Sequence, residues 1–253
     1  MKIIINCDDL GISAGVNEAI FELMEQGRVT SATLMMNAPA LEDAVSRLGK
    51  YKGCSFGVHM NLTEFAPLTS HPGLRPLLND KGEFSGVKLI HQQFFRWTGS
   101  LREGVQAELS AQVERALSLG VPVSHLDSHH HVHTRAGLLG VLREVQKRFG
   151  IGRIRSRRTV GSLARPMGRA RRAANEAWNL ALRRFVQVRT TDQFAAFGTF
   201  HEQLCTGIAL PGTIELMCHP GSVRFAEETA LLQGDWRARM HKEAQLMSYN
   251  DLV

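Results

Sequence analysis

The sequence has few cysteines and no long apolar run. Its four cysteines, Cys7, Cys54, Cys205 and Cys218, form no C-x-x-C pair, which fits reduced thiols better than a disulfide framework or a structural zinc site. No apolar run approaches the roughly 20 residues needed to cross a bilayer. The apolar stretch before Asp8 is too short for the core of a signal peptide. We therefore expect a soluble, cytoplasmic protein.

Acidic residues are scarce in one segment. Residues 151–190 contain eleven arginines and one acid, Glu176, which leaves nineteen of the 30 basic and twenty-three of the 24 acidic residues elsewhere. The net charge of +6 and the pI near 9.5 therefore have a local origin. Arginines and apolar residues recur at helical spacing on different sides, namely Arg165, Arg169, Arg172 and Arg183 against Trp178, Ala181, Leu182 and Phe185. This pattern predicts an amphipathic, arginine-rich helical segment within 156–190.

The arginine-rich segment 156–190 has two interpretations. It is either a solvated basic face over an apolar stripe, or a surface that binds an anionic or lipid-linked substrate at the inner face of a membrane. A basic pI also suggests nucleic-acid binding, but no finger spacing or aromatic RNA motif accompanies the arginines. We therefore expect no nucleic-acid partner, and the sequence leaves the oligomeric state open, a homodimer included.

Apolar runs and helical periodicity alternate along the chain. The 253 residues, 43% of them hydrophobic, suit one α/β domain. Strands are expected at 3–8, 29–36, 55–60, 121–127, 153–155, near 194 and at 213–218, and helices at 16–24, 39–48, 89–97, 101–119 and 138–149. Alternation of this kind predicts a single-domain (β/α) barrel over residues 1–253, TIM-barrel-like and open to irregular or incomplete closure. Residues 63–100 are expected to form a loop and helical insertion.

Five polar residues stand at or just beyond the carboxyl ends of the expected strands. They are Asp8, Asp9, His59, His129 and His219. In parallel α/β folds the chemistry gathers at this end of the strands. We therefore expect these residues to meet on one face of the barrel.

The two adjacent aspartates have two readings. Neighbouring side chains of a strand project in different directions, so one carboxylate can bind a metal ion while the other handles a proton. The alternative is that Asp8 or Asp9 caps the following helix, a position where aspartate is favoured.

A dense histidine cluster lies in the middle of the chain. The run S-H-L-D-S-H-H-H-V-H places five histidines within nine residues, at positions 125, 129, 130, 131 and 133. Imidazole binds zinc and similar divalent ions, and a carboxylate such as Asp127 can orient it. The five cannot all be ligands, and a loop whose histidines have no metal remains the alternative.

His59 completes a candidate site of two histidines and one carboxylate. Such a site leaves coordination positions open for water and substrate, which favours catalysis. His219, held before Pro220, can serve as the acid that protonates a leaving group. The same ligand set also occurs in non-haem iron oxygenases, and a phosphoesterase with a second metal is a further alternative.

Four motifs resemble the YdjC-like carbohydrate deacetylases, a family that includes chitooligosaccharide deacetylases and the deacetylase associated with hopanoid biosynthesis. They are N-C-D-D-L-G-I-S near the start, G-V-H-M-N-L-T at 57–63, H-L-D-S-H-H-H-V-H at 125–133 and I-E-L-M-C-H-P-G at 214–221. They occur in the family's order across almost the whole chain. The resemblance implies a barrel-like α/β fold, one divalent ion, Mg²⁺ or Zn²⁺, and hydrolysis of the N-acetyl group of a sugar or glycan.

Carried over position by position, the resemblance also implies roles for single residues. Asp9, His59 and His129 would be the metal ligands, Asp8 the base, His219 the general acid, and Arg155 a residue that orients the base or the substrate. Asn37 and Asp127 are further candidates for substrate-binding or supporting residues. The family's usual A-D-D-F-G differs here at Cys7 and Leu10. This change lies at the expected pocket floor, so the resemblance supports the family's metal more firmly than its substrate.

Overall fold

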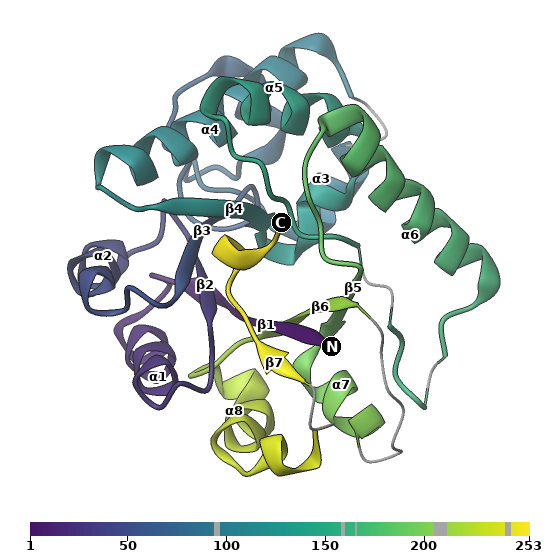
Figure 1. Cartoon of the computed structure of the whole chain (residues 1–253). Coiled ribbons are helices and arrows are strands. Elements are labelled where there is room, and N and C mark those ends of the chain that lie inside the picture. The colour runs from purple at the N-terminus through teal and green to yellow at the C-terminus, as the bar shows by residue number, and fades with distance from the viewer. Residues whose placement is uncertain (94–96, 158–159, 165, 205–211, 241–243) are drawn as a thin grey trace.

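Parallel strands form one sheet at the centre of the molecule (Figure 1). The computed structural model describes residues 1–93, 97–157, 160–164, 166–204, 212–240 and 244–253. Arg165, Cys205 and parts of the segments 63–100 and 156–190 lie outside the described residues. The strands are β1 (Lys2–Leu10), β2 (Ser31–Leu34), β3 (Ser55–Met60), β4 (Val123–Ser128), β5 (Gln193–Ala196), β6 (Thr213–Cys218) and β7 (Gln245–Leu246). Their order is β4-β3-β2-β1-β6-β5, with β7 also paired to β1.

The sheet curls into an incomplete barrel, as the alternation of strands and helices predicts. Between β4 and β5 the described residues form no regular strand, and isolated pairs continue the ring, Leu126 with Ile154 and Arg153 with Arg189. The expected strand at 153–155 is therefore wrong as a strand. Its backbone pairs with β4 on one side, where Leu126 N donates to Arg153 O, but no ladder extends from these bridges in the described chain.

Helices cover the outside of the sheet (Figure 1). They are α1 (Ala14–Glu25), α2 (Leu41–Arg47), α3 (Val87–Gln93), α4 (Gly99–Ser118), α5 (Leu139–Phe149), α6 (Arg169–Ala181), α7 (Phe197–Leu204) and α8 (Ala226–Gln233). The Ser13 side chain accepts a hydrogen bond from Val16 N at the start of α1, and Gly27 follows its end with φ +62°. The described helices contain no segment that is both long and apolar enough to span a membrane.

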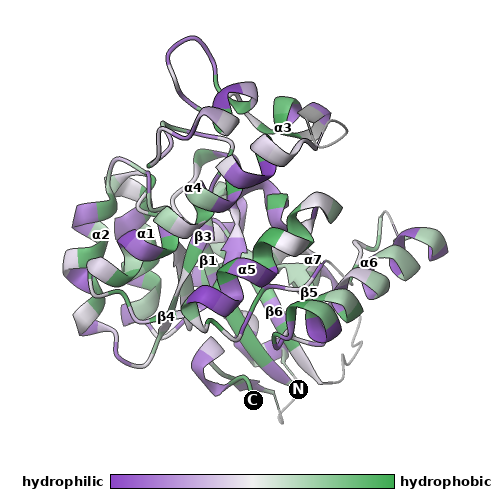
Figure 2. Cartoon of the chain, turned by 90° about the horizontal axis from the view of Figure 1, so that it is seen from above, coloured by the Kyte–Doolittle hydropathy of each residue, from purple (hydrophilic) through white to green (hydrophobic). Residues whose placement is uncertain are grey.

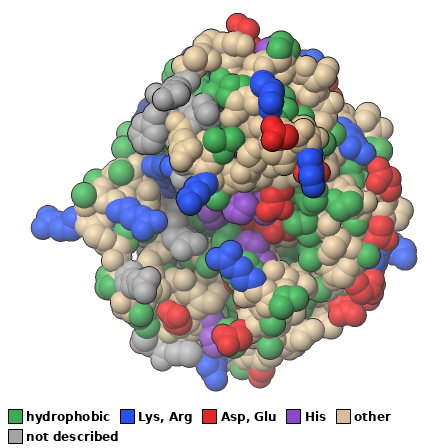
Figure 3. Space-filling model, turned by 180° about the vertical axis from the view of Figure 1, so that it is seen from behind, with side chains coloured by type: hydrophobic (Ala, Val, Ile, Leu, Met, Phe, Trp, Pro, Cys, Tyr) green, Lys and Arg blue, Asp and Glu red, His purple; other side chains and the backbone are tan. Residues whose placement is uncertain are grey.

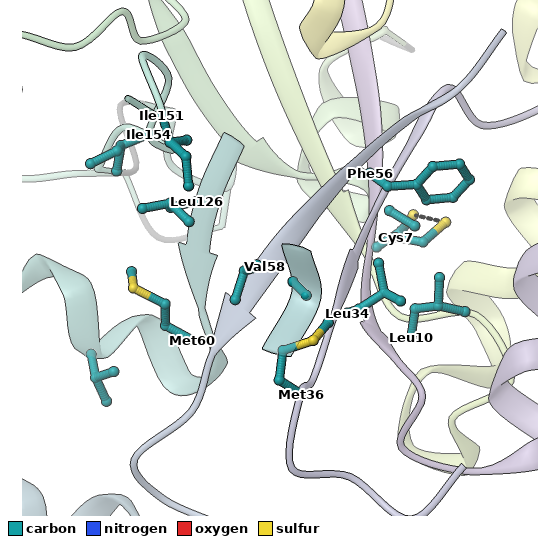
Figure 4. Packing of buried hydrophobic residues seen from close by; sticks show 14 of the residues in the cluster. Cys7, Leu10, Leu34, Met36, Phe56, Val58, Met60, Leu126, Ile151 and Ile154 are labelled. Atoms are coloured by element: carbon teal, nitrogen blue, oxygen red, sulfur yellow. Dashed lines mark hydrogen bonds between the residues drawn. The ribbon is translucent and has the colours of Figure 1, made fainter. Parts of the chain in front are cut away.

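The core lies between the strands and the outer helices. Cys7, Leu34, Val58 and Leu126, from four neighbouring strands, are fully buried and pack together (Figure 4). The Sγ atom of Cys7 lies 3.5 Å from that of Cys218 on β6, and both thiols are free. Strands buried on both faces explain why the sequence shows continuous apolar runs instead of alternation.

The two segments that the sequence sets apart lie at the periphery. Figure 2 shows α3, which belongs to the segment 63–100, at one side of the molecule and α6 at another. On the arginine-rich segment, Trp178 and Leu182 are buried as an apolar stripe predicts. Phe185, expected on the same stripe, is 43% exposed. Residues 182–186 form a π-helical turn, whose wider spacing takes Phe185 out of register with the stripe.

Candidate metal centre and active site

Asp9 is the point on which two histidines converge. It lies in a bulge of β1, where the register with β2 shifts between Cys7 and Leu10, and its φ is +65°. The Oδ1 atom of Asp9 is 3.2 Å from His59 Nε2 and 2.8 Å from His129 Nδ1. In a regular strand the side chains of Asp8 and Asp9 would point to opposite faces of the sheet. With the bulge, both approach the same histidine, and Asp8 Oδ2 lies 4.0 Å from His59 Nε2.

His129 reaches this point because β4 ends in an unusual turn. His130 and His131 have φ values of 51° and 53°, a left-handed conformation that is uncommon for residues other than glycine. The backbone therefore turns sharply directly after His129. An uncommon backbone conformation at the end of a strand indicates that the position of His129 serves a function.

The residues fit a divalent metal ion. One ligand atom from each of Asp9, His59 and His129 lies within 4.8 Å of the other two. Asp9 Oδ1 is buried, yet none of the described residues directs a hydrogen bond at it in spite of the two nearby ring nitrogens. Atoms that converge without hydrogen-bond alignment are what a shared cation requires.

Asp127 orients His59. Its Oδ1 lies 2.7 Å from His59 Nδ1, and its Oδ2 accepts a hydrogen bond from the Thr33 hydroxyl at 3.0 Å. Burial lowers the pKa of His59, but the charges of Asp127 and Asp8 outweigh it and raise that pKa from 6.5 to about 10. The histidine that Asp127 contacts is thus His59, which is distant in sequence, and not a member of the cluster that surrounds Asp127 in sequence.

Asp8 is clamped by Arg155. The guanidinium donates two hydrogen bonds, from Nη1 to Asp8 Oδ2 at 2.7 Å and from Nη2 to Oδ1 at 2.6 Å. Burial alone raises the pKa of Asp8, but the charge and hydrogen bonds of Arg155 outweigh it, so the pKa lies well below the usual value. Asp8 is therefore ionised at neutral pH, and the clamp fixes its orientation.

Arg155 joins Asp8 to two further carboxylates. This fully buried side chain donates from Nε to Glu215 Oε1 at 2.7 Å, and its Nη2 lies 2.8 Å from Asp127 Oδ2. The hydroxyl of Tyr249, in the C-terminal segment, donates to the other oxygen of Glu215. One buried cation thus links the three carboxylates in the floor of the barrel.

His219 faces Asp8 from the other side. It follows β6, and its Nε2 lies 4.0 Å from Asp8 Oδ2. Its ring stacks on Phe225 with centroids 4.3 Å apart, and Glu228 Oε1 accepts from its backbone N at 2.7 Å. Burial lowers the pKa of His219, but Glu228 and Asp8 outweigh it and raise that pKa. A protonated imidazole suits a proton donor.

The remaining clustered histidines have other neighbours. His125 stacks on Tyr249 at 3.6 Å, and the Nδ1 atom of His133 lies 2.5 Å from the Ser128 hydroxyl. His130 Nδ1 lies 2.9 Å from the Thr63 hydroxyl. His130 also belongs to a second group of potential metal ligands, together with Glu64 and His129.

Asn37 lies outside the metal cluster. Its side-chain amide donates to the carbonyls of Glu64 and Ala66 at 3.1 and 3.0 Å, and its Oδ1 accepts from Asn61 Nδ2 at 3.0 Å. These contacts hold the start of the segment 63–100 in place, so Asn37 supports the loop that carries Glu64.

Sequence reasoning missed several residues of the site. Thr33, Glu64, Glu215, Glu228 and Tyr249 were not singled out. Glu215 had a detectable signal, because a carboxylate inside the apolar run of β6 has to be buried and paired. Tyr249 has no comparable signal in the sequence, since its partner Glu215 lies 34 positions away.

One cavity borders the metal cluster, and a second lies beside the two histidines that follow His129. One of about 320 Å³ is lined by Asp8, Asp9 and His219, and a second of about 520 Å³ is lined by His130, His131 and several arginines. Figure 3 shows histidine and acidic side chains meeting in a hollow of the surface, with Lys or Arg side chains around it. Both cavities are large enough for part of a small-molecule ligand.

Comparison with known proteins places the chain among sequences of one family. A family model described as YdjC-like protein matches residues 2–250. The chain is similar to a carbohydrate deacetylase of Halalkalibacterium halodurans, with 32% identity over 224 residues that cover 88% of this chain and 86% of the relative. A carbohydrate deacetylase of Vibrio parahaemolyticus is 28% identical over 249 residues, 98% of this chain and 88% of the relative. One from Vibrio campbellii is 39% identical over 152 residues, which cover 60% of this chain and only 57% of that protein.

A solved structure shares the fold. A protein from Enterococcus faecalis, described as a candidate for cellobiose-phosphate cleavage, superposes with a TM-score of 0.79 at 23% identity and covers 100% of this chain and 98% of its own. This likeness supports the incomplete (β/α) barrel as the common architecture.

Proposed function

Because this chain belongs to the YdjC-like protein family, we propose that it is a metal-dependent deacetylase, which hydrolyses the N-acetyl group of a sugar or glycan to acetate and a free amine. The carbohydrate deacetylases among its relatives support this reaction. The observation that carries it is the convergence of His59 and His129 on Asp9, with Asp8 and His219 beside them.

Asp9, His59 and His129 would hold the ion. A bound divalent ion supplies Lewis acidity for the acetyl carbonyl and for the attacking water. Two imidazoles and one carboxylate suit Zn²⁺, and the oxygen ligands nearby also suit Mg²⁺. His59 is prepared for this role, because Asp127 engages its Nδ1 and leaves Nε2 directed at Asp9.

Asp8 and His219 are the proposed proton-transfer pair. Asp8 is ionised and accepts the proton of the attacking water. Its hydrogen bonds with Arg155 fix its orientation but also make it a weak base. His219 stays protonated to a higher pH than an ordinary histidine and donates its proton to the departing amine. The distance of 4.0 Å between Asp8 Oδ2 and His219 Nε2 supports this pairing, because both side chains then border the same small volume.

Acetate release tests the proposal. The metal-stripped protein, restored in turn with Zn²⁺ and Mg²⁺, is assayed on a panel of N-acetylated sugars and glycans. Asp8→Asn should abolish turnover while metal still binds, and the matched change Asp80→Asn, at a fully exposed side chain, should leave turnover unchanged. Full activity in Asp8→Asn would remove Asp8 from the mechanism. Oxygen consumption by an iron-loaded protein without acetate release would instead favour an oxygenase.

Contact with a membrane surface is a separate part of the proposal. The exposed side chains of Leu180 and Phe185 stand beside arginines on the segment 156–190, a combination that suits anionic lipid. Sedimentation with anionic vesicles at low salt is the test, and absence of binding would exclude this surface as a lipid contact.

A further inference from the structure

The two histidines of the proposed metal centre present different ring nitrogens to Asp9. His59 directs Nε2 at this residue, and Asp127 engages its Nδ1. His129 directs Nδ1 at Asp9 Oδ1, at a distance of 2.8 Å, so its Nε2 lies on the far side of the ring. A histidine that binds a metal usually donates its other ring N–H to a carboxylate, a carbonyl or water, which fixes the tautomer and the orientation of the ring. His129 Nε2 therefore needs an acceptor of this kind.

Glu64 offers that acceptor. Its Oε1 lies 3.4 Å from His129 Nε2, and a shift of about half an ångström would bring the pair to an ordinary hydrogen-bond distance. His129 Nε2 is buried, and within the described chain it has no aligned hydrogen bond. A buried N–H group without an acceptor is costly. Because the Glu64 side chain is 40% exposed, it has room to make this small movement.

The backbone of Glu64 is held in place from the side of the barrel. Asn61 Nδ2 donates to Glu64 O at 2.7 Å, and Glu64 N donates to Asn61 Oδ1 at 3.2 Å. Asn61 is fully buried, and its backbone N and O bond to Oε1 and Nε2 of Gln112 on α4. Asn37 adds a second donor to Glu64 O. A loop residue that only faces solvent needs no such support, so the fold itself places this carboxylate beside His129.

A second metal ion is the rival explanation for these side chains. Glu64, His129 and His130 each offer a ligand atom within 4.8 Å of the others. Such an ion would take His129 Nε2 while the first ion takes Nδ1, so the ring would have to lose its last N–H proton. His130 is exposed, and its Nδ1 is engaged by the Thr63 hydroxyl at 2.9 Å. A hydrogen bond from His129 Nε2–H to Glu64 requires no such deprotonation and is therefore favoured.

We propose that Glu64 is a positioning residue of the metal centre, whose carboxylate accepts a hydrogen bond from His129 Nε2–H and keeps Nδ1 unprotonated for the ion. The inference rests on the proposed function, because that function assigns His129 to the ion. A neutral imidazole has one N–H group, and a carboxylate beside Nε2 retains the proton there. The metal centre then has matched supports, Asp127 behind His59 and Glu64 behind His129. This contact also ties the segment 63–100 to the metal centre.

Calorimetry of the metal-stripped protein with Zn²⁺ is the first test. The wild type should bind one ion, and Glu64→Ala should lower the affinity about 10- to 100-fold, the loss that follows when such a partner of a metal-binding histidine is removed. Glu64→Gln keeps a side-chain oxygen that can accept the Nε2 proton, so its loss should be smaller. Glu83→Ala removes an exposed carboxylate of the same segment. It is the matched control and should bind Zn²⁺ as the wild type does.

The second test separates positioning of His129 from a general loosening of the loop. Visible absorption of the Co²⁺-loaded protein reports the ligands and their geometry. At saturating Co²⁺ the spectrum of Glu64→Ala should therefore differ from the spectra of the wild type and Glu83→Ala, while urea unfolding of the metal-free proteins should give similar stabilities. An unchanged Co²⁺ spectrum together with a lower stability of metal-free Glu64→Ala would make the role of Glu64 structural and overturn the proposal.

The ion count and the activity complete the test. Equal Zn²⁺ affinity in the wild type, Glu64→Ala and Glu83→Ala would overturn the role of Glu64. Two bound ions in the wild type and one in Glu64→Ala would assign Glu64 to a second metal site and also overturn it. If the affinities follow the expected order but no N-acetylated sugar releases acetate, the positioning role stands and the proposed reaction fails. Acetate release without a bound ion would overturn the metal centre and this inference with it, while the hydrolysis stands.

Discussion

Replacement of Glu215 by glutamine isolates the cost of ionising a buried carboxyl group beneath the proposed active site. Burial raises the pKa of Glu215 from 4.5 to about 7, although the charge of Arg155 acts in the opposite direction. Between these two values the folded chain binds more protons than the unfolded chain does. The contribution of Glu215 to the free energy of unfolding is therefore fully present below pH 4.5 and is lost as the pH rises through about 7.

The magnitude follows from the same two pKa values. The difference between 4.5 and about 7 corresponds to about 3 kcal/mol, because one pKa unit is worth about 1.36 kcal/mol. Glutamine has the same size but cannot ionise. Any change in its contacts with Arg155 and Tyr249 adds an offset that does not depend on the ionisation of residue 215. The stability of Glu215→Gln relative to the wild type should thus rise by about 3 kcal/mol across this pH range.

Urea unfolding of both proteins, followed by circular dichroism at a series of pH values, measures this difference. Glu103→Gln, an exposed change on α4, is the matched control and should give a much smaller pH dependence. A constant difference between Glu215→Gln and the wild type across the range would refute the reasoning, and so would a difference of opposite sign.

Two other changes test the support of the metal centre. Asp127→Asn removes the charge that orients His59, so affinity for Zn²⁺ measured by calorimetry should fall about 10- to 100-fold; unchanged affinity would show that this contact is dispensable. Gly57→Ala would place a Cβ atom 2.6 Å from the backbone oxygen of His125 between β3 and β4, and should lower the unfolding free energy by about 1–3 kcal/mol. Gly53→Ala, with open space around the added atom, is its control, and equal stability of the two variants would contradict the clash.

The negative charges of the site need positive charges to balance them. The side chains of Asp8, Asp9 and Asp127 lie close together and are largely buried. Their negative charges repel one another, which is unfavourable unless cations lie nearby. Arg155 supplies one fixed positive charge, and His59 supplies another when it is protonated. Binding of a divalent ion would release the proton of His59, so the affinity for metal should increase with pH.

The amino-acid sequence by itself determined the parallel strands and the placement of most candidate residues. The expected strands 55–60 and 213–218 have the bounds of β3 and β6, because short apolar runs bounded by turn residues have few other solutions. Strand ends of a parallel sheet meet at one edge, so His59, His129 and His219 could be expected near Asp9 before any contact was known. The short helices α7 and α8 were not predicted.

Only the tertiary structure decided how these residues are held. The bulge at Asp9, the turn after His129 and the pairing of Arg155 with Asp8 across 147 positions leave no periodic trace in the sequence. Tyr249 reaches Glu215 because the C-terminal segment packs against the starts of β1 and β3, where β7 pairs with Lys2 and Ile3 and Tyr249 N donates to the Ser55 hydroxyl. Periodicity reports which face of an element is buried, whereas the partner of a buried charge depends on how the barrel closes, and that is a property of the whole chain.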